Sequence, residues 1–425
     1  DLPKKGQLGQ GRAWPPPGTT ARGPRGRSQP KSAPQELPAS QTAVFARVPP
    51  PTGDLATGPA ACNGGSAAEF SCSGINLRSR VPLNDMGGAA GNDIWGWADA
   101  LTGNEYALMG MTNGTAFVDV TDPENPVFVG ILPTETISTP WRDIKVYQDH
   151  AYIVADASGA HGMQVFDLAR LRGVSAPQTF TEDALYSDFG NAHNLAINED
   201  TGFAYAVGSN TCEHGLHMID ITTPNNPLFA GCHDLFDVHD TQCVSYSGPD
   251  PDYANAEICA NSAGERVEFV DVSNKAAPVS IAAIDDPQRG YVHQGWLTED
   301  HRFLLIGDEL DERNFGVRTR THIIDALDLD APVYVSAYEG PTAAIDHNLY
   351  ILGNRVFEAN YTSGLRVLEF GVLGNSELSE IAFFDTYPGS EAANFDGAWS
   401  VYPYLPSGNI LVSDTGYGLF VLTLQ

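Results

Sequence analysis

The feature that most constrains this chain of 425 residues is a short phrase that occurs seven times. Each copy is a run of apolar residues typical of a β-strand, and the copies end at Asp119, Asp167, Asp220, Asp271, Asp325, Glu369 and Thr423. They are about 44 to 54 residues apart, which matches a four-stranded propeller blade, and they lack the 3.6-residue stripe of a helical repeat. We therefore predict an all-β fold, a seven-bladed β-propeller of four-stranded blades over residues 61–425.

A ring of blades has to close, because an open ring would leave unpaired sheet edges at the seam. The seventh copy lies at the end of the sequence, so its blade is one strand short. Residues 75–83 precede the first blade and read as a strand. We predict that this N-terminal strand joins the last blade, with Cys62 and Cys72 clamping its approach.

Residues 1–60 differ from the rest in composition, being rich in Pro, Gly, Ser and Arg with a net charge of about +5. A segment with so few large apolar residues cannot offset its ordering entropy, so we expect a disordered leader or linker. The remaining residues carry about −35. Such a surface repels nucleic acid, which we exclude as a partner. No run of 18 apolar residues is present, so no membrane-spanning helix is expected.

Six cysteines fall into three pairs that are close in sequence: Cys62 with Cys72, Cys212 with Cys232, and Cys243 with Cys259. An even number without a C-x-x-C motif favours disulfides in an oxidising compartment. The alternative is six buried thiols in a reduced protein. The first residue is Asp1 rather than Met, as expected for a chain that has lost a signal peptide. We predict a secreted or cell-surface protein.

Several of these phrases resemble a known family. The phrase GLHMIDITTP at residues 215–224 resembles the LVIVD repeat. Together with NDIWGW at 92–97, WRDIKVY at 141–147, YVHQGWLTED at 291–300 and AIDHNLY at 344–350, it is similar to the choice-of-anchor B family. The resemblance implies an exported protein displayed through varied anchoring tails. It implies no particular reaction.

In a propeller the first strand of every blade lines the central channel. At one matching position of these strands, four consecutive blades offer histidine and two others offer aspartate. These residues are His193, His239, His293, His347, Asp93 and Asp143. One interpretation is a transition-metal site for Fe, Cu or Zn, with the aspartates as further ligands or as hydrogen-bond partners of the imidazoles. The other is structural, with each histidine bonding to the neighbouring blade.

A second candidate site is an acidic loop at residues 307–313. Its carboxylates suit a hard cation such as Ca²⁺, and they come from Asp308, Glu309, Asp311 and Glu312. The spacing is not that of an EF-hand loop, whose ligands follow a fixed frame. The alternative is a solvated acidic loop without an ion.

Together these features favour an exported binding or interaction module for a small ligand, a polymer or another surface protein. The first alternative is a metalloenzyme, an oxidoreductase or hydrolase that uses the four axial histidines. The second is a structural protein of a surface assembly. No P-loop, dinucleotide-binding fingerprint or nucleophile elbow is present in the sequence, so whether the protein is an enzyme stays open.

Overall fold

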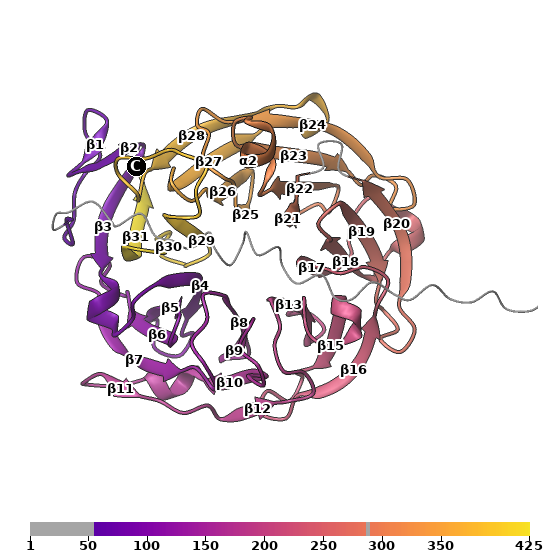
Figure 1. The fold of residues 1–425 in the computed structure, drawn as a ribbon, viewed down its shortest axis with the longest axis horizontal. Coiled ribbons are helices and arrows are strands. Elements are labelled where there is room, and N and C mark those ends of the chain that lie inside the picture. Colours follow the sequence, from indigo (N-terminus) through magenta and orange to yellow (C-terminus); the bar gives the residue numbers. More distant parts are fainter. Residues whose placement is uncertain (1–54, 286–289) are drawn as a thin grey trace, which may run out of the picture. The chain divides into compact units, whose positions relative to one another are not determined.

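The computed structural model describes residues 55–285 and 290–425, and most of the predicted leader lies outside these ranges. The described chain forms seven β-sheets arranged in a ring, and each sheet contains the four antiparallel strands of one blade. Figure 1 shows the first strand of every blade next to the centre of the ring. The predicted seven-bladed propeller is confirmed.

The blades follow one another along the chain. Blade one contains β4 Gly91–Ala98, β5 Glu105–Met111, β6 Gly114–Asp119 and β7 Val127–Pro133. Blade two contains β8 Arg142–Tyr147, β9 His150–Ala155, β10 Met163–Asp167 and β12 Ala184–Tyr186. Blade three contains β13 Asn194–Asn198, β14 Phe203–Val207, β15 Leu216–Asp220 and β16 Leu228–His233. Blade four contains β17 Asp240–Ser245, β18 Glu257–Ser262, β19 Arg266–Asp271 and β20 Val279–Asp285. Blade five contains β21 Val292–Leu297, β22 Phe303–Asp308, β23 Arg320–Asp325 and β24 Val333–Glu339.

The last two blades take strands from the N-terminal segment as well. Blade six contains β25 Asn348–Leu352, β26 Arg355–Ala359, β27 Leu365–Phe370 and β28 Leu378–Phe384, extended outward by β2 Phe70–Ser73 and β1 Ser66–Ala67. Blade seven contains β29 Ala398–Tyr402, β30 Ile410–Asp414, β31 Gly418–Leu424 and β3 Ile75–Val81. The short strand β11 Gln178–Thr179 adds to β7 of blade one.

The strand β3 closes the ring as predicted from the sequence. It pairs antiparallel with β31, from Ile75 opposite Leu424 to Val81 opposite Leu419. The Arg80 guanidinium crosses the same seam and donates a hydrogen bond of 2.8 Å to the carbonyl of Tyr417. The last blade therefore combines strands from both ends of the propeller, which leaves no open edge at the seam.

All three predicted cysteine pairs are disulfides. Cys62–Cys72 lies just before β3, in the position expected for a clamp on the closing strand. Cys243–Cys259 joins two residues that face each other on β17 and β18. The structure describes no free cysteine.

The repeated aspartate of each phrase fixes the turn that follows it. In five blades its Oδ1 accepts the backbone N–H two residues later, at 2.9 to 3.0 Å, as in local Asp-stabilised turns. These residues are Asp119, Asp167, Asp220, Asp271 and Asp325. The acidic position of the repeat therefore serves the fold.

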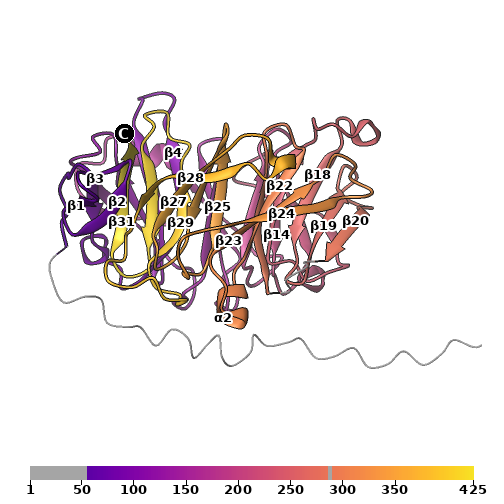
Figure 2. The same ribbon diagram turned by 90° about the horizontal axis from the view of Figure 1, so that it is seen from above.

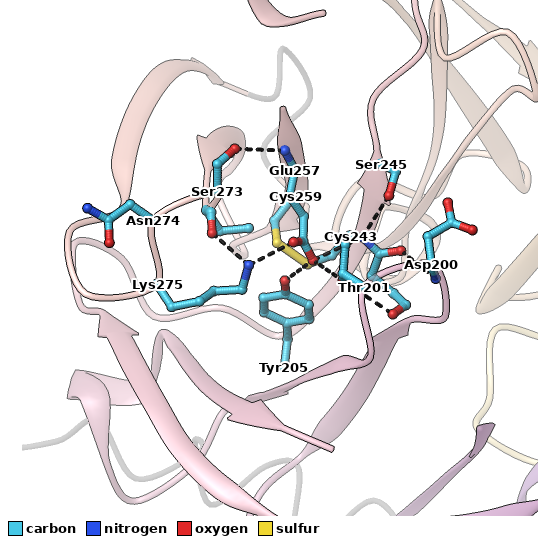
Figure 3. Close-up of polar contacts among 12 residues, drawn as sticks. Asp200, Thr201, Tyr205, Cys243, Ser245, Glu257, Cys259, Ser273, Asn274 and Lys275 are labelled. Carbon is cyan, nitrogen blue, oxygen red and sulfur yellow. Dashed lines mark hydrogen bonds and ion pairs between the residues drawn. A yellow bond between two sulfur atoms is a disulfide. The ribbon is translucent and has the colours of Figure 1, made fainter. Parts of the chain in front are cut away.

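Neighbouring blades pack through apolar faces and are also joined by buried polar groups. The buried carboxylate of Glu257 on β18 accepts hydrogen bonds from Asn198 and Tyr205 of blade three and pairs with Lys275, whose Nζ lies 2.7 Å away. Figure 3 shows Tyr205 and Lys275 beside Glu257, close to the Cys243–Cys259 disulfide. Apolar contacts also join neighbouring blades. Phe117 of blade one stacks on Phe166 of blade two, with ring centroids 4.7 Å apart.

Within residues 55–285 and 290–425, helical structure is limited to short turns. The α-helix α2, Asp311–Phe315, follows β22, and Figure 2 shows it on one face of the ring. Single 3-10 turns are Leu83–Met86, Leu168–Leu171, Cys212–His214, Pro251–Tyr253 and Leu373–Asn375. Among the described residues, none of the helices has the length and hydropathy needed to cross a bilayer.

Candidate metal centre

The four predicted histidines lie side by side at the axis. His193, His239 and His347 immediately precede β13, β17 and β25, and His293 lies within β21. The ring centroids of successive histidines are 4.3, 4.3 and 4.2 Å apart. The matching position in four consecutive blades therefore places four imidazoles in one continuous arc, as the sequence predicts.

One nitrogen of most of these rings is held by the protein. The Nδ1 atoms of His239 and His347 donate to the backbone carbonyls of His293 and Trp399 in the next blade. His193 donates through Nδ1 to Asp156, at 2.9 Å. A carbonyl or carboxylate only accepts, so Nδ1 carries the proton and Nε2 of the neutral ring keeps its lone pair. This is the tautomer that a metal-binding imidazole needs.

A carboxylate from another element completes the group. Oε2 of Glu309 lies 3.9 Å from Nε2 of His293, and its Oε1 lies 3.8 Å from Nε2 of His347. His293, Glu309 and His347 are all buried, and each offers a ligand atom within 4.8 Å of the other two. The Tyr361 hydroxyl donates to Oε1 of Glu309 at 3.1 Å and holds it in place. Two imidazoles and one carboxylate this close together could hold a metal ion.

The electrostatics of this layer keep most of its imidazoles uncharged. Burial lowers the pKa of His347 to about 3. Burial, with the neighbouring histidines as a further cause, also lowers the pKa values of His239 and His293 well below the ordinary value. His193 differs, because the Asp156 hydrogen bond and charge outweigh its burial and raise its pKa. Burial raises the pKa of Glu309 to about 7.

The two aspartates of the predicted set have other partners. Asp93 accepts the backbone N–H of Ile144 at 3.1 Å, and Asp143 accepts that of Leu195 at 2.7 Å, each in the next blade. The Lys145 ammonium lies 2.6 Å from Asp143 and 4.0 Å from Asp93. Neither aspartate belongs to a group of metal-ligating atoms among the described residues. Their observed contacts join the blades.

The predicted calcium loop is divided between two places. Glu309 points to the histidines, whereas Asp308, Asp311 and Glu312 lie in a separate buried acidic region. There Asp311 and Glu312 meet Asp346 from the segment before β25, with ligand atoms within 4.8 Å of one another. Burial and then Asp311 raise the pKa of Glu312 to about 9. This buried region therefore gathers carboxyl groups from two blades, and it contains Asp346, which was not predicted, instead of Glu309.

Sequence reasoning missed three residues that shape these sites: Glu309 as a partner of the histidines, Asp156 beside His193, and Asp346. Glu309 and Asp156 follow the second strand of their blades, and Asp346 precedes a first strand. Because strands alternate in direction, the start of the first strand and the end of the second lie on the same face of the ring. That alternation is the signal in the sequence that points to them.

Comparisons with known proteins identify the fold and nothing finer. No family model and no curated protein matches the chain. Hydrazine synthase from Kuenenia stuttgartiensis is similar in structure, with a TM-score of 0.52 and 12% identity over 74% of this chain and 91% of that one. The Swd1 β-propeller domain from Myceliophteria thermophila has a TM-score of 0.51 and 10% identity, over 80% and 98%. A Lactobacillus plantarum protein has a TM-score of 0.50 and 13% identity, over 71% and 85%. The chain thus has the β-propeller fold of these structures.

Proposed function

We propose that this protein is an exported β-propeller binding module that holds a transition-metal ion at its axis through His293, His347 and Glu309. The observation that carries the proposal is the position of these three buried side chains, whose ligand atoms lie within 4.8 Å of one another. Nitrogen and carboxylate ligands suit Zn, Fe or Cu. Imidazoles that stay neutral need not lose a proton to bind an ion.

The structural interpretation of the histidines is compatible with this proposal. Hydrogen bonds from His239 and His347 to the next blade use Nδ1, whereas the contacts of His293 and His347 with Glu309 involve Nε2. One nitrogen braces the ring and the other is available to an ion. Bracing of this kind also orients the ligands, which raises the affinity of a metal site.

The space beside the histidines favours ion binding over catalysis. The cavity lined by His193, His293, His347, Trp141 and Trp399 has a volume of about 10 Å³, close to the volume needed for one water molecule. A bound ion would act there as a Lewis acid on a small ligand such as water. A metalloenzyme for a larger substrate fits this volume poorly, so binding is the function that we propose.

Export is part of the proposal and is supported by the three disulfides, which persist in oxidising compartments. Membership of the choice-of-anchor B family and display at a surface remain predictions from the repeated phrases. The calcium site also remains a prediction, now for Asp308, Asp311 and Glu312 with Asp346 added. Buried carboxyl groups this close can share protons or a cation, and the Arg320 guanidinium already lies 3.8 Å from Asp311.

The metal proposal is tested by elemental analysis of metal-free protein after exposure to Zn²⁺, Cu²⁺ or anaerobic Fe²⁺ and dialysis. We expect one equivalent of one ion in the wild type, and its loss in a variant that combines His293→Ala with Glu309→Gln. His150→Ala, which removes a histidine outside the axial layer, is the control and should bind like the wild type. No retained metal in the folded wild type would disprove the proposal.

A second variant separates ligation from simple stability. Tyr361→Phe removes the hydroxyl that orients Glu309 and leaves the three ligands in place. The loss of such a partner lowers metal affinity about 10- to 100-fold. Competition with a chelator of known affinity measures this change. Equal affinity in Tyr361→Phe and wild type would contradict the role given to Tyr361 in orienting Glu309 for an ion.

A further inference from the structure

A larger cavity lies on the axis, separate from the histidine pocket. Its volume is about 430 Å³, within the range of small-molecule binding sites. The first strand of every blade contributes to its lining, as Trp95, Lys145, Ala196, Asp240, Trp296, Tyr350 and Tyr402 show. Asp240 begins β17 directly after His239, but the other six residues belong to the middle or later parts of their strands, whereas the histidines lie next to the strand starts. The cavity therefore has its own lining and its own chemistry.

One wall of this cavity is aromatic. It consists of Trp95, Trp296, Tyr350, Tyr402 and Tyr404, from blades one, five, six and seven. Their rings touch in series: Trp296 lies 4.8 Å from Tyr350, Trp95 lies 5.0 Å from Tyr402, and Tyr402 lies 5.4 Å from Tyr404, between centroids. Such a wall presents ring faces and edges to a ligand.

The charged groups of the lining are mostly acidic. Asp240, Glu199 and Glu299 line the cavity, and Lys145 is the one basic residue among the described lining residues. The charge of Lys145 is offset by Asp143, whose Oδ1 lies 2.6 Å from its Nζ. The cavity therefore has more acidic than basic groups next to its aromatic rings. Burial and then Asp143 raise the pKa of Asp240 to about 7, so a cation bound beside it would favour its ionised form.

The protein itself places an ammonium group on this wall. Nζ of Lys145 lies 4.6 Å from the centroid of the Trp95 ring, a geometry in which the ring quadrupole attracts a cation. The remaining rings make no cation contact of this kind among the described residues; they are Trp296, Tyr350, Tyr402 and Tyr404. They have the same attraction to offer to a ligand.

We propose that the axial cavity binds a small organic cation, an ammonium group carried on an apolar frame. The aromatic wall attracts the ammonium group and buries its methyl or methylene groups, and the carboxylates complement its charge. The proposal is independent of the metal site, because it uses none of the residues that hold the ion.

Calorimetric titration of metal-free protein tests the proposal with three probes. These are choline, a trimethylammonium alcohol; 3,3-dimethylbutan-1-ol, its uncharged counterpart of the same shape; and methyl β-glucoside, a neutral sugar that stacks on aromatic rings. We expect saturable binding of choline, with the uncharged alcohol at least about tenfold weaker because it lacks the cation–π attraction. Equal binding of the alcohol, preferential binding of the sugar, or no binding of choline would each overturn the proposal.

Two substitutions place the probe in the cavity. Trp296→Leu removes a ring and Asp240→Asn removes a charge without changing the side-chain shape, and each is expected to weaken choline binding about tenfold. Asp234→Asn changes an exposed acid elsewhere and should bind like the wild type. Circular dichroism confirms that each variant is folded. Unchanged binding in both cavity variants would show that choline binds elsewhere, against the proposal.

Discussion

At the scale of single residues, the axial layer combines two tasks in one kind of side chain. His239 and His347 each bond to the next blade through one ring nitrogen. Their pKa values are lowered mainly by burial, so the other nitrogen stays unprotonated at neutral pH. Histidine repeated around the axis therefore joins the blades, and in the proposed metal site the same side chains would supply neutral ligands.

Alignment of the first strands predicted the meeting of the four histidines but not that of Glu309 with them. A residue within an inner strand has its direction set by the alternation of the strand. Glu309 instead lies in the turn after β22, where turn length and the start of α2 decide which way the side chain points. In the sequence, residues 308–312 looked like one acidic loop. In the structure, the Glu309 side chain faces His293 and His347, whereas Asp311 and Glu312 lie beside Asp346.

Asp99 ties blade one to the loop between β10 and β12 of blade two. Its buried carboxylate accepts hydrogen bonds of 2.7 and 2.8 Å from Arg172, and these hold the pKa of Asp99 well below the ordinary value of 3.8. A carboxyl whose pKa is lowered by folding stabilises the folded state above its unfolded pKa and loses that effect as the pH falls through its folded pKa.

Asp99→Asn should therefore lower the urea midpoint at neutral pH, and the gap from the wild type should narrow below about pH 4. Urea unfolding of both proteins, followed by fluorescence from acid to neutral pH, measures the gap. Asp234→Asn, at an exposed acid, serves as the control. A gap that stays the same at every pH would contradict the role given to the Asp99 charge.

At the scale of elements, the closing strand was predictable because the last blade lacked a fourth strand in its own part of the sequence and needed one from elsewhere in the chain. The expected segment was 75–83, and β3 covers Ile75–Val81. Proline at position 82 has no backbone N–H for a ladder, which explains the earlier end. The additional strands β1 and β2 on blade six were not predicted, since strands of two and four residues leave little periodic signal.

The seam between β3 and β31 gives a matched pair of glycine substitutions. Gly418 has a φ of 96°, and a Cβ there would lie 2.2 Å from the Val81 carbonyl oxygen on the closing strand. Gly408 has a φ of 78°, with nothing within 4 Å of such a Cβ. Gly408→Ala should cost about 1 kcal/mol of stability through backbone strain alone.

Gly418→Ala carries the same strain and also forces the closing strand away from its partner. We expect its thermal midpoint to fall clearly below that of Gly408→Ala, with earlier proteolysis near the N-terminal strand. Scanning calorimetry and limited proteolysis of the two variants provide the comparison. Similar midpoints would mean that the seam contributes little to the stability of the ring.

At the scale of the whole molecule, the number of blades was predictable from the sequence repeat, and the negative charge of the surface was predictable from the composition. The formal net charge is −30, so like charges repel one another across the surface and oppose the compact state. Added salt screens this repulsion, with a screening length of about 3 Å at 1 M. The ligand of such a surface was not predictable, because charge alone selects no chemical class.

Raising NaCl from low to molar concentration should therefore increase the thermal midpoint by a few degrees, as long as no specific ion is involved. Differential scanning fluorimetry in NaCl and in KCl makes the measurement, and equal shifts in the two salts indicate screening. A midpoint that falls with salt would mean that attractive ion pairs outweigh the net repulsion.

The closing strand also sets the order of events when the protein is made. The hydrogen bond from Arg80 to Tyr417 joins residues 337 positions apart, and contacts of such long range are slow to form. Blades can assemble one after another as the chain is synthesised or translocated, because each is built from neighbouring strands. The ring, however, can close only after β31 has been made. Until then the growing chain has an unpaired strand edge at each end, and chaperones have to protect these edges from aggregation.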